Sequence, residues 1–600
     1  MKIQRVRIIG FRSIKSLESD IPDFLCLVGG NNHGKSNILQ AINIFFTAPK
    51  SLPDSYYYRW VGAESICSVT NTIEITLQFD DLSVQEKSLL NGYVVDDTIQ
   101  LMRRYTNDVT GQLSEYKIFQ MIPTDEWLKE DYAHYNNREI LSKLPIYEFI
   151  PPTNKITKQI FLDAKKSYEE KYSGKIERSL QLMPVSAELK KVLDTVLPQF
   201  YFVPAIIDAT DEIKSNGDTL FSKIINSTIE RMVTNNQDFK TILGVLNDFW
   251  GRIEVQAKQG QISQIKQLEK LLKDELKQWN VEPKIILDKP DFTKLMAIQS
   301  HMILNDGIDT VVGGKGHGLQ RSLIFALFKI IASEKRTDHQ THSFRTIIYA
   351  IEEPELYLHP HMCRATYEIL KDLSEVDQIL LCTHSQNFVD MEDYHDIILV
   401  KKEKEGTEVH HVQKDIFPGN LKQQFKMVKY FTPDRNEIFF SKKVILVEGL
   451  TERSLLPLLA RRLSIFDHSV SIIDCAGKDN IPLFMVILNE FKIPYYVIHD
   501  EDPISPQYLP GGTLHDPKRL KNMKHTFDLN VTIESACDKS IGLVKKIPGE
   551  VENLLEITHG EADRYGKPYA ATKKYIEESQ LIPPDLEKLV REAYKMPSYE

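Results

Sequence analysis

The sequence predicts an α/β protein built from more than one domain, and three observations lead to that prediction. The chain has 600 residues, whereas a single hydrophobic core stops growing at about 250–300 residues. Short apolar runs at 346–351 and 378–382 are typical of buried parallel strands. A glycine-rich loop at 29–36 stands between a strand-like run and an apolar-periodic helix, the order in which a parallel sheet presents a phosphate site.

The composition is that of an ordinary globular protein. The chain is 42% apolar and 26% charged, which excludes a disordered, collagenous or wholly coiled-coil protein. No apolar run reaches about 18 residues, and the first residues lack the pattern of a signal peptide. The six cysteines include no Cys-x-x-Cys pair, so neither a disulfide framework nor a zinc module is indicated. We therefore expect a cytoplasmic protein with no membrane association.

The formal net charge of −10, from 74 Lys+Arg and 84 Asp+Glu, restricts how the protein can meet a polyanion. It argues against coating nucleic acid by bulk charge, but it allows a local basic groove. One such place is the basic stretch 515–525, with His515, Lys518, Arg519, Lys521, Lys524 and His525. This stretch either holds a DNA backbone or is a solvated charge run, and the sequence leaves both interpretations open.

Hydrophobic periodicity divides the chain into four segments. Residues 1–207 mix strands and helices, and the alternation at 72–79 predicts a half-buried strand. Within 208–285 apolar residues recur at three- and four-residue steps, which predicts amphipathic helices. The αβ mixture returns in 286–436, and a last αβ unit occupies 437–600. The helical segment is either a subdomain that packs on itself or a dimerisation module.

Residues 29–36 form a complete G-x-x-x-x-G-K-[ST] loop. In such a loop backbone N–H groups close around phosphate, the lysine reaches the β and γ oxygens, and the Ser36 hydroxyl binds Mg²⁺. The alternative is a structural glycine turn. The predicted ATP contacts are Gly29, Asn32, Gly34, Lys35, Ser36 and Asn37.

The apolar run 346–351 leads into Glu352-Glu353-Pro354-Glu355. A buried strand that delivers two acids suits coordination of Mg²⁺-bound water by Glu352 and activation of water by Glu353. A solvated strand end is the alternative interpretation.

Two further features are less specific. Residues 313–322 form a glycine-rich turn, including Gly316, that opens an apolar helix. The N-terminus of such a helix can face an anion, although a plain loop fits equally well. His384, in Thr-His-Ser at the end of a buried strand, is either a nucleotide contact or structural. His359, His361 and Cys363 are interpreted as packing and interface residues rather than as a metal site.

Along the chain, the phosphate loop, the glycine-rich turn, the acidic strand end and His384 follow one another. Four such features in this order resemble ABC-type ATPases of the recombination and SMC-like group. The resemblance implies that ATP is sandwiched between two heads, each of which lends its signature loop in trans. Gly316 and His384 would then contact nucleotide. The sequence departs from the pattern at Glu352, where Asp is usual, and in lacking an LSGG-type signature.

A second group of acids follows two later strands. The run 444–447 ends in Glu448, and the run 495–499 ends in Asp500-Glu501-Asp502. Neighbouring strand ends would bring Glu448, Asp500 and Asp502 to one place. Clustered carboxylates need cations, oxygen ligands suit Mg²⁺ or Mn²⁺, and two such ions can clamp the attacking and leaving oxygens of a phosphodiester.

Downstream residues add candidates to this site. Glu552 is a possible further ligand, with Glu550 and Glu556 as rivals, and Lys567 is a candidate for stabilising charge that builds on phosphate. Each is equally well interpreted as a surface residue.

The two strand-end motifs together resemble a Toprim domain, the fold shared by topoisomerases, primases and some nucleases. With the ATPase and its helical insertion, nearly the whole chain resembles the OLD (overcoming lysogenization defect) family of bacterial and phage-encoded nucleases. Glu448, Asp500 and Asp502 match that family's metal positions. Glu452, Glu552 and Lys567 match less closely.

The resemblance implies an ATP-hydrolysing, Mg²⁺- or Mn²⁺-dependent DNA endonuclease or nickase with a role in phage defence. It also implies a homodimer formed through the ATPase heads and the inserted helices. Family members act alone or beside a genomic partner, such as a helicase or a retron reverse transcriptase. The rival expectation is an ATP-gated, SMC-like DNA clamp without nuclease activity. A topoisomerase or primase is disfavoured, because neither a breakage domain nor a Cys/His zinc module is apparent.

Overall fold

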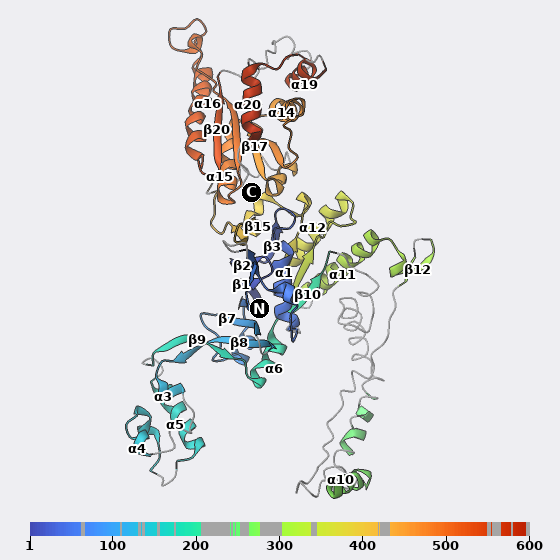
Figure 1. Cartoon of the computed structure of the whole chain (residues 1–600), viewed down its shortest axis with the longest axis vertical. Helices are drawn as coiled ribbons and strands as arrows, with labels where there is room; N and C mark the ends of the chain where they lie inside the picture. The colour runs from blue at the N-terminus through green and yellow to red at the C-terminus, as the bar shows by residue number, and fades with distance from the viewer. Residues whose placement is uncertain are drawn as a thin grey trace. The chain divides into compact units, whose positions relative to one another are not determined.

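The computed structural model describes most of the chain (Figure 1). The described residues are 1–61, 67–108, 111–129, 134, 138–152, 156–172, 176–205, 241, 244–246, 248–252, 263–275, 303–305, 307–337, 345–417, 419, 433–548, 554, 566–577 and 580–595. The chain splits into two compact units, one of residues 1–205, 342–355 and 359–600, the other of residues 206–341 and 356–358. Among the described residues, no helix is both long and apolar enough to cross a membrane.

An antiparallel sheet with the order β2-β1-β6-β7-β8-β9 opens the first unit. Its strands are β1 (Lys2–Phe11), β2 (Ile14–Asp20), β6 (Thr72–Asp80), β7 (Ile99–Asp108), β8 (Gly111–Pro123) and β9 (Arg178–Pro184). The alternation predicted at 72–79 is found in β6, where Ile73, Ile75 and Leu77 are fully buried. A short antiparallel ribbon, β4 (Arg59–Val61) and β5 (Cys67–Val69), lies outside this sheet.

A second sheet, with the order β10-β13-β14-β3-β15-β16, carries the phosphate loop. Its strands are β3 (Phe24–Val28), β10 (Gln199–Val203), β13 (Ile347–Glu352), β14 (Gln378–Cys382), β15 (Ile397–Glu403) and β16 (Gly406–His411). Its neighbouring strands are parallel apart from the β15–β16 hairpin. All residues of β3, β13 and β14 are buried, as expected for parallel strands covered on both faces.

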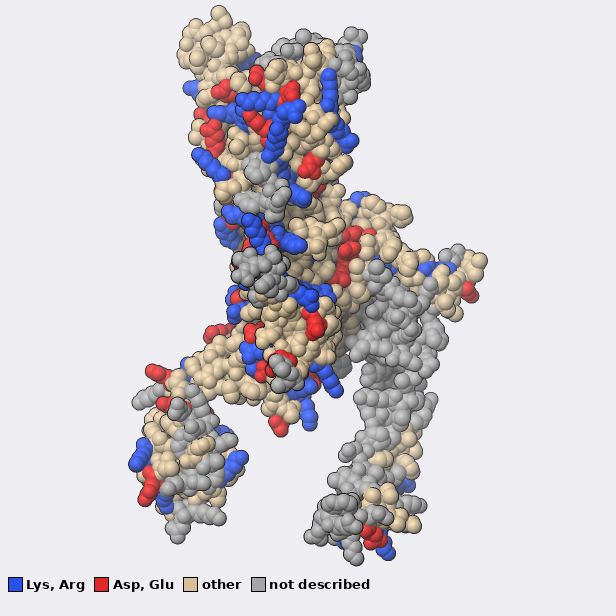
Figure 2. All heavy atoms as spheres, viewed as in Figure 1, with Lys and Arg blue, Asp and Glu red and all other residues tan. Residues whose placement is uncertain are grey.

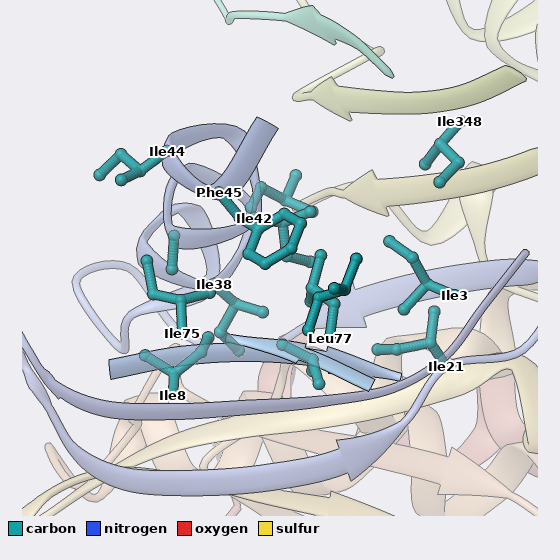
Figure 3. Packing of buried hydrophobic residues seen from close by; sticks show 14 of the residues in the cluster. Ile3, Ile8, Ile21, Ile38, Ile42, Ile44, Phe45, Ile75, Leu77 and Ile348 are labelled. Carbon is teal, nitrogen blue, oxygen red and sulfur yellow. The ribbon is translucent and has the colours of Figure 1, made fainter. Parts of the chain in front are cut away.

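Helix α1 (Lys35–Thr47) joins the two sheets into one core. Its apolar residues recur at helical spacing, so Ile38, Ile42 and Phe45 fall on one face. Figure 3 shows this face lying over Ile75 and Leu77 of β6, all within one buried cluster. Each fully buried side chain of this size stabilises the fold by about 1.5–3 kcal/mol. The burial holds the first turn of α1 at the end of β3.

The remaining helices of this part of the first unit are α2 (Val84–Leu89), α3 (Glu126–Lys129), α4 (Arg138–Leu141), α5 (Lys158–Lys171), α6 (Ala187–Val196) and α12 (Pro360–Ser374). Between β8 and β9, the segment with α3, α4 and α5 has a small core of its own. Leu141, Ile146 and Phe161 are buried in it, and aromatic rings such as Trp127 and Tyr168 contact edge to face. This satellite core was not apparent from the periodicity of the sequence.

The C-terminal part of the first unit is a four-stranded parallel sheet with the order β18-β17-β19-β20. Its elements are β17 (Lys443–Val447), α14 (Leu450–Arg462), β18 (Val470–Asp474), α15 (Ile481–Glu490), β19 (Tyr495–Asp500), α16 (Pro517–Ala536), β20 (Gly542–Ile547), α19 (Lys567–Thr572) and α20 (Pro584–Lys595). Helices α15 and α16 pack together, and α14 packs with α19 and α20 (Figure 1). The central strands β17 and β19 direct their carboxyl ends to the same edge of the sheet.

The second unit contains the described helices α10 (Ser263–Glu275) and α11 (His317–Thr337) and the β11 (Ile303–Asn305)–β12 (Asp309–Val311) hairpin. Helix α10 lies where amphipathic periodicity predicted a helix within 208–285. The other helix predicted there, at 220–233, lies outside the described residues. The dimerisation role of this segment stays a prediction.

Candidate active sites

The phosphate loop follows β3 and ends where α1 begins. Gly29 has φ 138°, and a Cβ there would lie 2.2 Å from the Val400 carbonyl oxygen of β15. Gly34 has φ 104°, and a Cβ there would lie 2.2 Å from Thr407 Oγ1 of β16. Only glycine fits both positions without displacing backbone or a packed side chain. The two glycines therefore let the β15–β16 hairpin close against the loop.

Lys35 lies at the first turn of α1 and is buried. Its Nζ donates to the carbonyl oxygens of Gly29, at 3.0 Å, and Gly30, at 2.8 Å. Burial lowers the pKa of this ammonium group, and Glu353 and Glu355 act against that change. The start of α1 has no side-chain cap, so its first N–H groups and Lys35 together form the positive end of a helix that suits phosphate.

Polar side chains from β16 and from the β1–β2 turn hold the loop. Thr407 Oγ1 donates to the His33 carbonyl oxygen at 2.9 Å and shares a 2.7 Å hydrogen bond with Ser13 Oγ. Asn37 donates to Ser13 Oγ at 2.8 Å and accepts from Arg12 Nη1 at 3.1 Å. Asn37 is thus occupied with the loop's own scaffold.

The acidic strand end and the histidine lie on strands next to β3. Glu352 ends β13, is buried, and accepts a hydrogen bond from the Ser36 hydroxyl. Burial raises the pKa of Glu352. Glu353 has φ 44°, and its N–H donates to the Cys382 carbonyl oxygen at 2.7 Å. Because β13, β14 and β3 are adjacent and parallel, the predicted Glu352, Glu353 and His384 lie at the same sheet edge as the phosphate loop.

Glu355 fixes the end of β14. Its carboxylate accepts from His384 N–H at 2.6 Å and from Thr383 Oγ1 at 2.8 Å. Burial, and then the charge of Lys35, lowers the pKa of His384, which favours the neutral imidazole. No role was predicted for Glu355 from the sequence. Its two hydrogen bonds connect the segment after β13 to the end of β14 and so stabilise this site.

The glycine-rich turn 313–322 belongs to the second unit. Gln320 Nε2 donates to the carbonyl oxygens of Lys315, at 2.7 Å, and Val312, at 3.2 Å. The turn is therefore closed on itself by the buried Gln320 at the start of α11. Gly316, immediately before α11, accepts from Leu319 N–H at 3.0 Å. Its predicted contact with nucleotide in trans stays a prediction.

Glu448 and Asp500 meet at the carboxyl ends of β17 and β19. Glu448 Oε1 accepts from the Asp500 N–H at 2.7 Å. Glu452 lies on the first turn of α14, and its Oε2 would lie 3.9 Å from a Cβ added to Gly449, so its carboxylate lies close to the residue that follows Glu448. Burial raises the pKa of Glu448 to about 7, and Asp502 and Glu452 act in the same direction. Removing a carboxylate from water disfavours its charged form, and nearby negative charges add to that effect.

A buried lysine stands at the third acid. Lys478, in the turn after β18, is 4% exposed, and its Nζ donates to Asp502 Oδ2 at 2.9 Å and to the Asp500 carbonyl oxygen at 2.6 Å. Asp502 has φ 48°, a left-handed conformation. Lys478 was not predicted as a site residue from the sequence. Its signal was a lysine directly after Gly477 at the carboxyl end of a parallel strand.

Asp474 anchors the strand beside β17 through two arginines. Its Oδ1 accepts from Arg435 Nη2 at 2.8 Å, and its Oδ2 accepts from Arg453 Nη1 at 2.7 Å. Burial alone would raise the pKa of Asp474, but the hydrogen bonds from Arg453 and Arg435 outweigh it and hold that pKa below its usual value. Arg453 follows Glu452 on α14, so the network also orients the helix that carries Glu452.

Three predicted residues remain to be placed. Lys567 is the exposed first residue of α19, which packs on α14. Asn32 is exposed in the phosphate loop with φ 64°. Glu552, with its rivals Glu550 and Glu556, lies outside the described residues.

The acids of the second site are of the kind that binds a divalent cation, but too few of them lie close together among the described residues. Glu448, Asp500 and Asp502 supply the carboxylate oxygens that Mg²⁺ and Mn²⁺ prefer, and burial above all raises the pKa of Glu448. Within the described ranges, however, no three His, Cys, Asp or Glu side chains gather closely enough to hold a metal ion. Lys478 already neutralises Asp502 there.

Comparison with known proteins gives two family matches. A sequence model described as an AAA ATPase domain matches residues 1–389. A model described as the TOPRIM domain of overcoming lysogenization defect protein-like proteins matches residues 439–502. The two matches divide the chain close to the start of the four-stranded sheet.

Two relatives and one solved structure illustrate the similarity. The chain is 32% identical over 196 residues to the OLD nuclease of Thermus scotoductus, covering 31% of this chain but only 35% of that protein. It is 22% identical over 565 residues to the Old nuclease of Escherichia phage P2, covering 91% and 84% of the two chains. The SMC head domain from Thermotoga maritima aligns with a TM-score of 0.30 at 14% identity, over 69% of this chain and all of that one.

Proposed function

The chain belongs to the AAA ATPase domain family and joins that domain to a Toprim domain of the OLD type, and from this premise we propose that it is an ATP-hydrolysing, divalent-metal-dependent DNA endonuclease or nickase. The observation that supports the proposal most directly is the meeting of Glu448 and Asp500 at two adjacent strand ends, 2.7 Å apart from carboxylate oxygen to backbone nitrogen. Two carboxylates at the ends of neighbouring parallel strands would be held in fixed positions from which they could bind a cation.

In the proposed reaction the ions would be held by Glu448, Asp500 and Asp502, with Glu452 beside them. Bound there, divalent ions supply electrophilic stabilisation and a water of lowered pKa. The protein's own contribution is placement. The Asp500 N–H orients the Glu448 carboxylate, and Lys478 fixes Asp502 and the carbonyl of Asp500. Lys567 and Glu552 keep their proposed roles as a transition-state cation and a further ligand.

The ATPase site is proposed to bind Mg·ATP at the start of α1. Lys35 and the uncapped N–H groups of α1 would hold the phosphates. Ser36 and Glu352, which are hydrogen-bonded to one another, would share the Mg²⁺ and its water. Glu353 would position the attacking water. Pairing of two heads would bring Gly316 of one chain to the nucleotide of another, with the helical insertion strengthening a homodimer.

Cleavage of supercoiled plasmid with Mg²⁺ or Mn²⁺ tests the nuclease. We expect the wild-type chain to nick or linearise the plasmid. Glu448→Ala and Asp500→Ala should reduce the rate by at least about 10²-fold, since each removes a group whose role is electrostatic placement at the reacting centre. The matched control is Glu501→Ala, an acid in the same loop with no assigned role. Equal nicking by all four proteins would contradict the assignment.

A second candidate is an ATP-gated DNA clamp that does not cut. It is favoured by the pairing of Asp502 with Lys478 and by the lack of a three-acid cluster among the described residues. The clamp predicts ATP-dependent retention of closed circular DNA and no product in the plasmid assay with either metal.

We further propose a role in defence against phage, alone or with a partner encoded nearby such as a helicase or a reverse transcriptase. The support is the architecture shared with the Old nuclease of phage P2. Expression in a susceptible host should lower the plating efficiency of some phages. Glu448→Ala and Lys35→Ala should abolish that protection, and protection that persists in both variants would contradict the proposal.

A further inference from the structure

The first half of α16 carries three lysines that no acid of the described residues pairs with. Residues 515–528 include four Lys or Arg and two Asp, in a chain whose net charge is −10. Lys518, Lys521 and Lys524 are exposed, and no ion pair to them is found among the described residues. Five other lysines in this part of the molecule each pair with a carboxylate: Lys478, Lys492, Lys545, Lys546 and Lys588.

Two of these lysines, Lys521 and Lys524, line a hollow in the surface of the protein. At 100° per residue, Lys518, Lys521 and His525 fall on one side of the helix. A shallow hollow of about 530 Å³ lies there, lined by His515, Leu520, Lys521, Lys524, His525 and Asp528. Beside it, Arg519 stacks on Tyr508 with its guanidinium carbon 4.3 Å from the ring centroid. On the face drawn in Figure 2, basic and acidic side chains are interspersed.

The same helix touches the acidic strand ends. His525 Nε2 lies 2.8 Å from Asp479 Oδ1, and Asp479 directly follows Lys478, which is bound to Asp502. Further along α16, Asn530 Nδ2 donates to the Glu501 carbonyl oxygen at 2.7 Å. Asn530 is buried, so the helix is fixed to the acidic loop rather than free to move away from it.

We propose that the basic face of α16, formed by Lys518, Lys521 and Lys524, binds the phosphate backbone of duplex DNA and leads it to the acids at the ends of β17 and β19. The substrate class rests on the proposed function. The acids repel phosphate, whereas the lysines attract it. A backbone held on α16 is therefore kept next to a site that its own charge would otherwise make it avoid.

The test is binding of a fluorescein-labelled DNA duplex to the full chain, followed by anisotropy in EDTA so that no metal-dependent cleavage occurs. The test variant is K518Q/K521Q/K524Q. Each phosphate contact contributes about 0.9 to the slope of log affinity against log salt. We expect that slope to fall by about 2 to 3 and the affinity at low salt to fall at least about tenfold.

The matched control is K442Q/K539Q/K595Q, which removes the same charge from three exposed lysines of the same domain. Lys442 directly precedes β17, and Lys595 ends α20. K518R/K521R/K524R should restore binding, and equal thermal midpoints should show that the variants fold. Equal binding by wild type and test variant, equal loss in test and control variants, or no binding by wild type would each overturn the proposal.

The DNA-binding experiment and the plasmid cleavage assay can fail independently of one another. If wild type cuts plasmid but binding is indifferent to the α16 lysines, the surface is wrong and the nuclease stands. If binding depends on α16 but no metal supports cutting, the surface stands and the nuclease is wrong.

Discussion

At the scale of single residues, the two sites are organised by buried cations that have acceptors within the protein. Lys35 donates to two carbonyl oxygens of its own loop, and Lys478 donates to Asp502 and to a strand end. Both ammonium groups are already placed where anionic oxygens are proposed to bind. Exchanging those acceptors for a ligand costs less than dehydrating a free lysine, because the desolvation has occurred on folding.

Lys35→Ala is expected to lower ATP hydrolysis at least about 10²-fold, since it removes a preorganised cation from the developing phosphate charge. Release of inorganic phosphate measures it. Lys50→Ala, at an exposed lysine after α1, is the control and should hydrolyse ATP like wild type. A Lys35→Ala protein with near wild-type turnover would contradict the assignment of the loop.

Asp474→Ala is expected to destabilise the Toprim part by about 3–5 kcal/mol, because it removes the carboxylate that pairs with the charge of the buried Arg435. Urea unfolding of the full chain measures it. Asp479→Ala, at an exposed ion pair with His525, should have little effect on unfolding. Loss of stability of similar size in both variants would contradict the argument.

The same residue predicts a pH dependence. Hydrogen bonds hold the pKa of Asp474 below its usual value in the folded chain. Its contribution to stability is therefore complete above the ordinary aspartate pKa of about 3.9 and is lost as the pH falls through the lower folded value. In Asp474→Asn, the free energy of unfolding should change less than in wild type as the pH is lowered below about 3.9.

At the scale of elements, the decisive feature is the contact between the β15–β16 hairpin and the phosphate loop. Thr407 holds the His33 carbonyl and Ser13 at once. The loop is thus braced by strands that come from residues far apart in the chain. A rigid loop offers its N–H groups to phosphate without further ordering.

Gly34→Ala should weaken ATP binding at least about tenfold. The new Cβ would lie 2.2 Å from Thr407 Oγ1, at φ 104°, so the hairpin or the loop must move. Gly92→Ala is the control, because Gly92 also has a positive φ, 87°, but nothing within 4 Å of the added carbon. That variant should have only the backbone strain of about 1–2 kcal/mol and normal ATP binding. Nucleotide titration measures both, and equal affinities would exclude this bracing role.

At the scale of the whole molecule, the chain carries its two proposed sites on two separate sheets. Each sheet has its own buried core. Chemistry at one site therefore does not require intact acids at the other. Glu448→Ala should keep ATP hydrolysis within about twofold of wild type while it loses cleavage. Phosphate release and plasmid nicking, measured on the same preparation, check this, and a parallel loss of ATP hydrolysis would contradict independent sites.

Local pattern determined much of the architecture. The strand predicted at 378–382 has the same bounds as β14, and that predicted at 346–351 is shifted by one residue in β13. The loop, the acids and their strands follow from hydrophobic period and residue type, because both depend on neighbours in the chain. The six-stranded antiparallel sheet and the satellite core around Phe161 were not predicted, since strand pairing depends on partners distant in sequence.

The sequence by itself therefore determined which residue types end which strands, and from them the two kinds of chemistry. Only the tertiary structure decided which side chains meet. Lys478 reaches Asp502 across 24 residues, and Arg435 reaches Asp474 across 39. The physical reason is that a buried charge needs a partner of opposite charge once the strands are adjacent. Hydrophobic periodicity, which reflects only neighbours in the chain, does not predict which distant residue that partner is. The same adjacency places the basic face of α16 beside the acids.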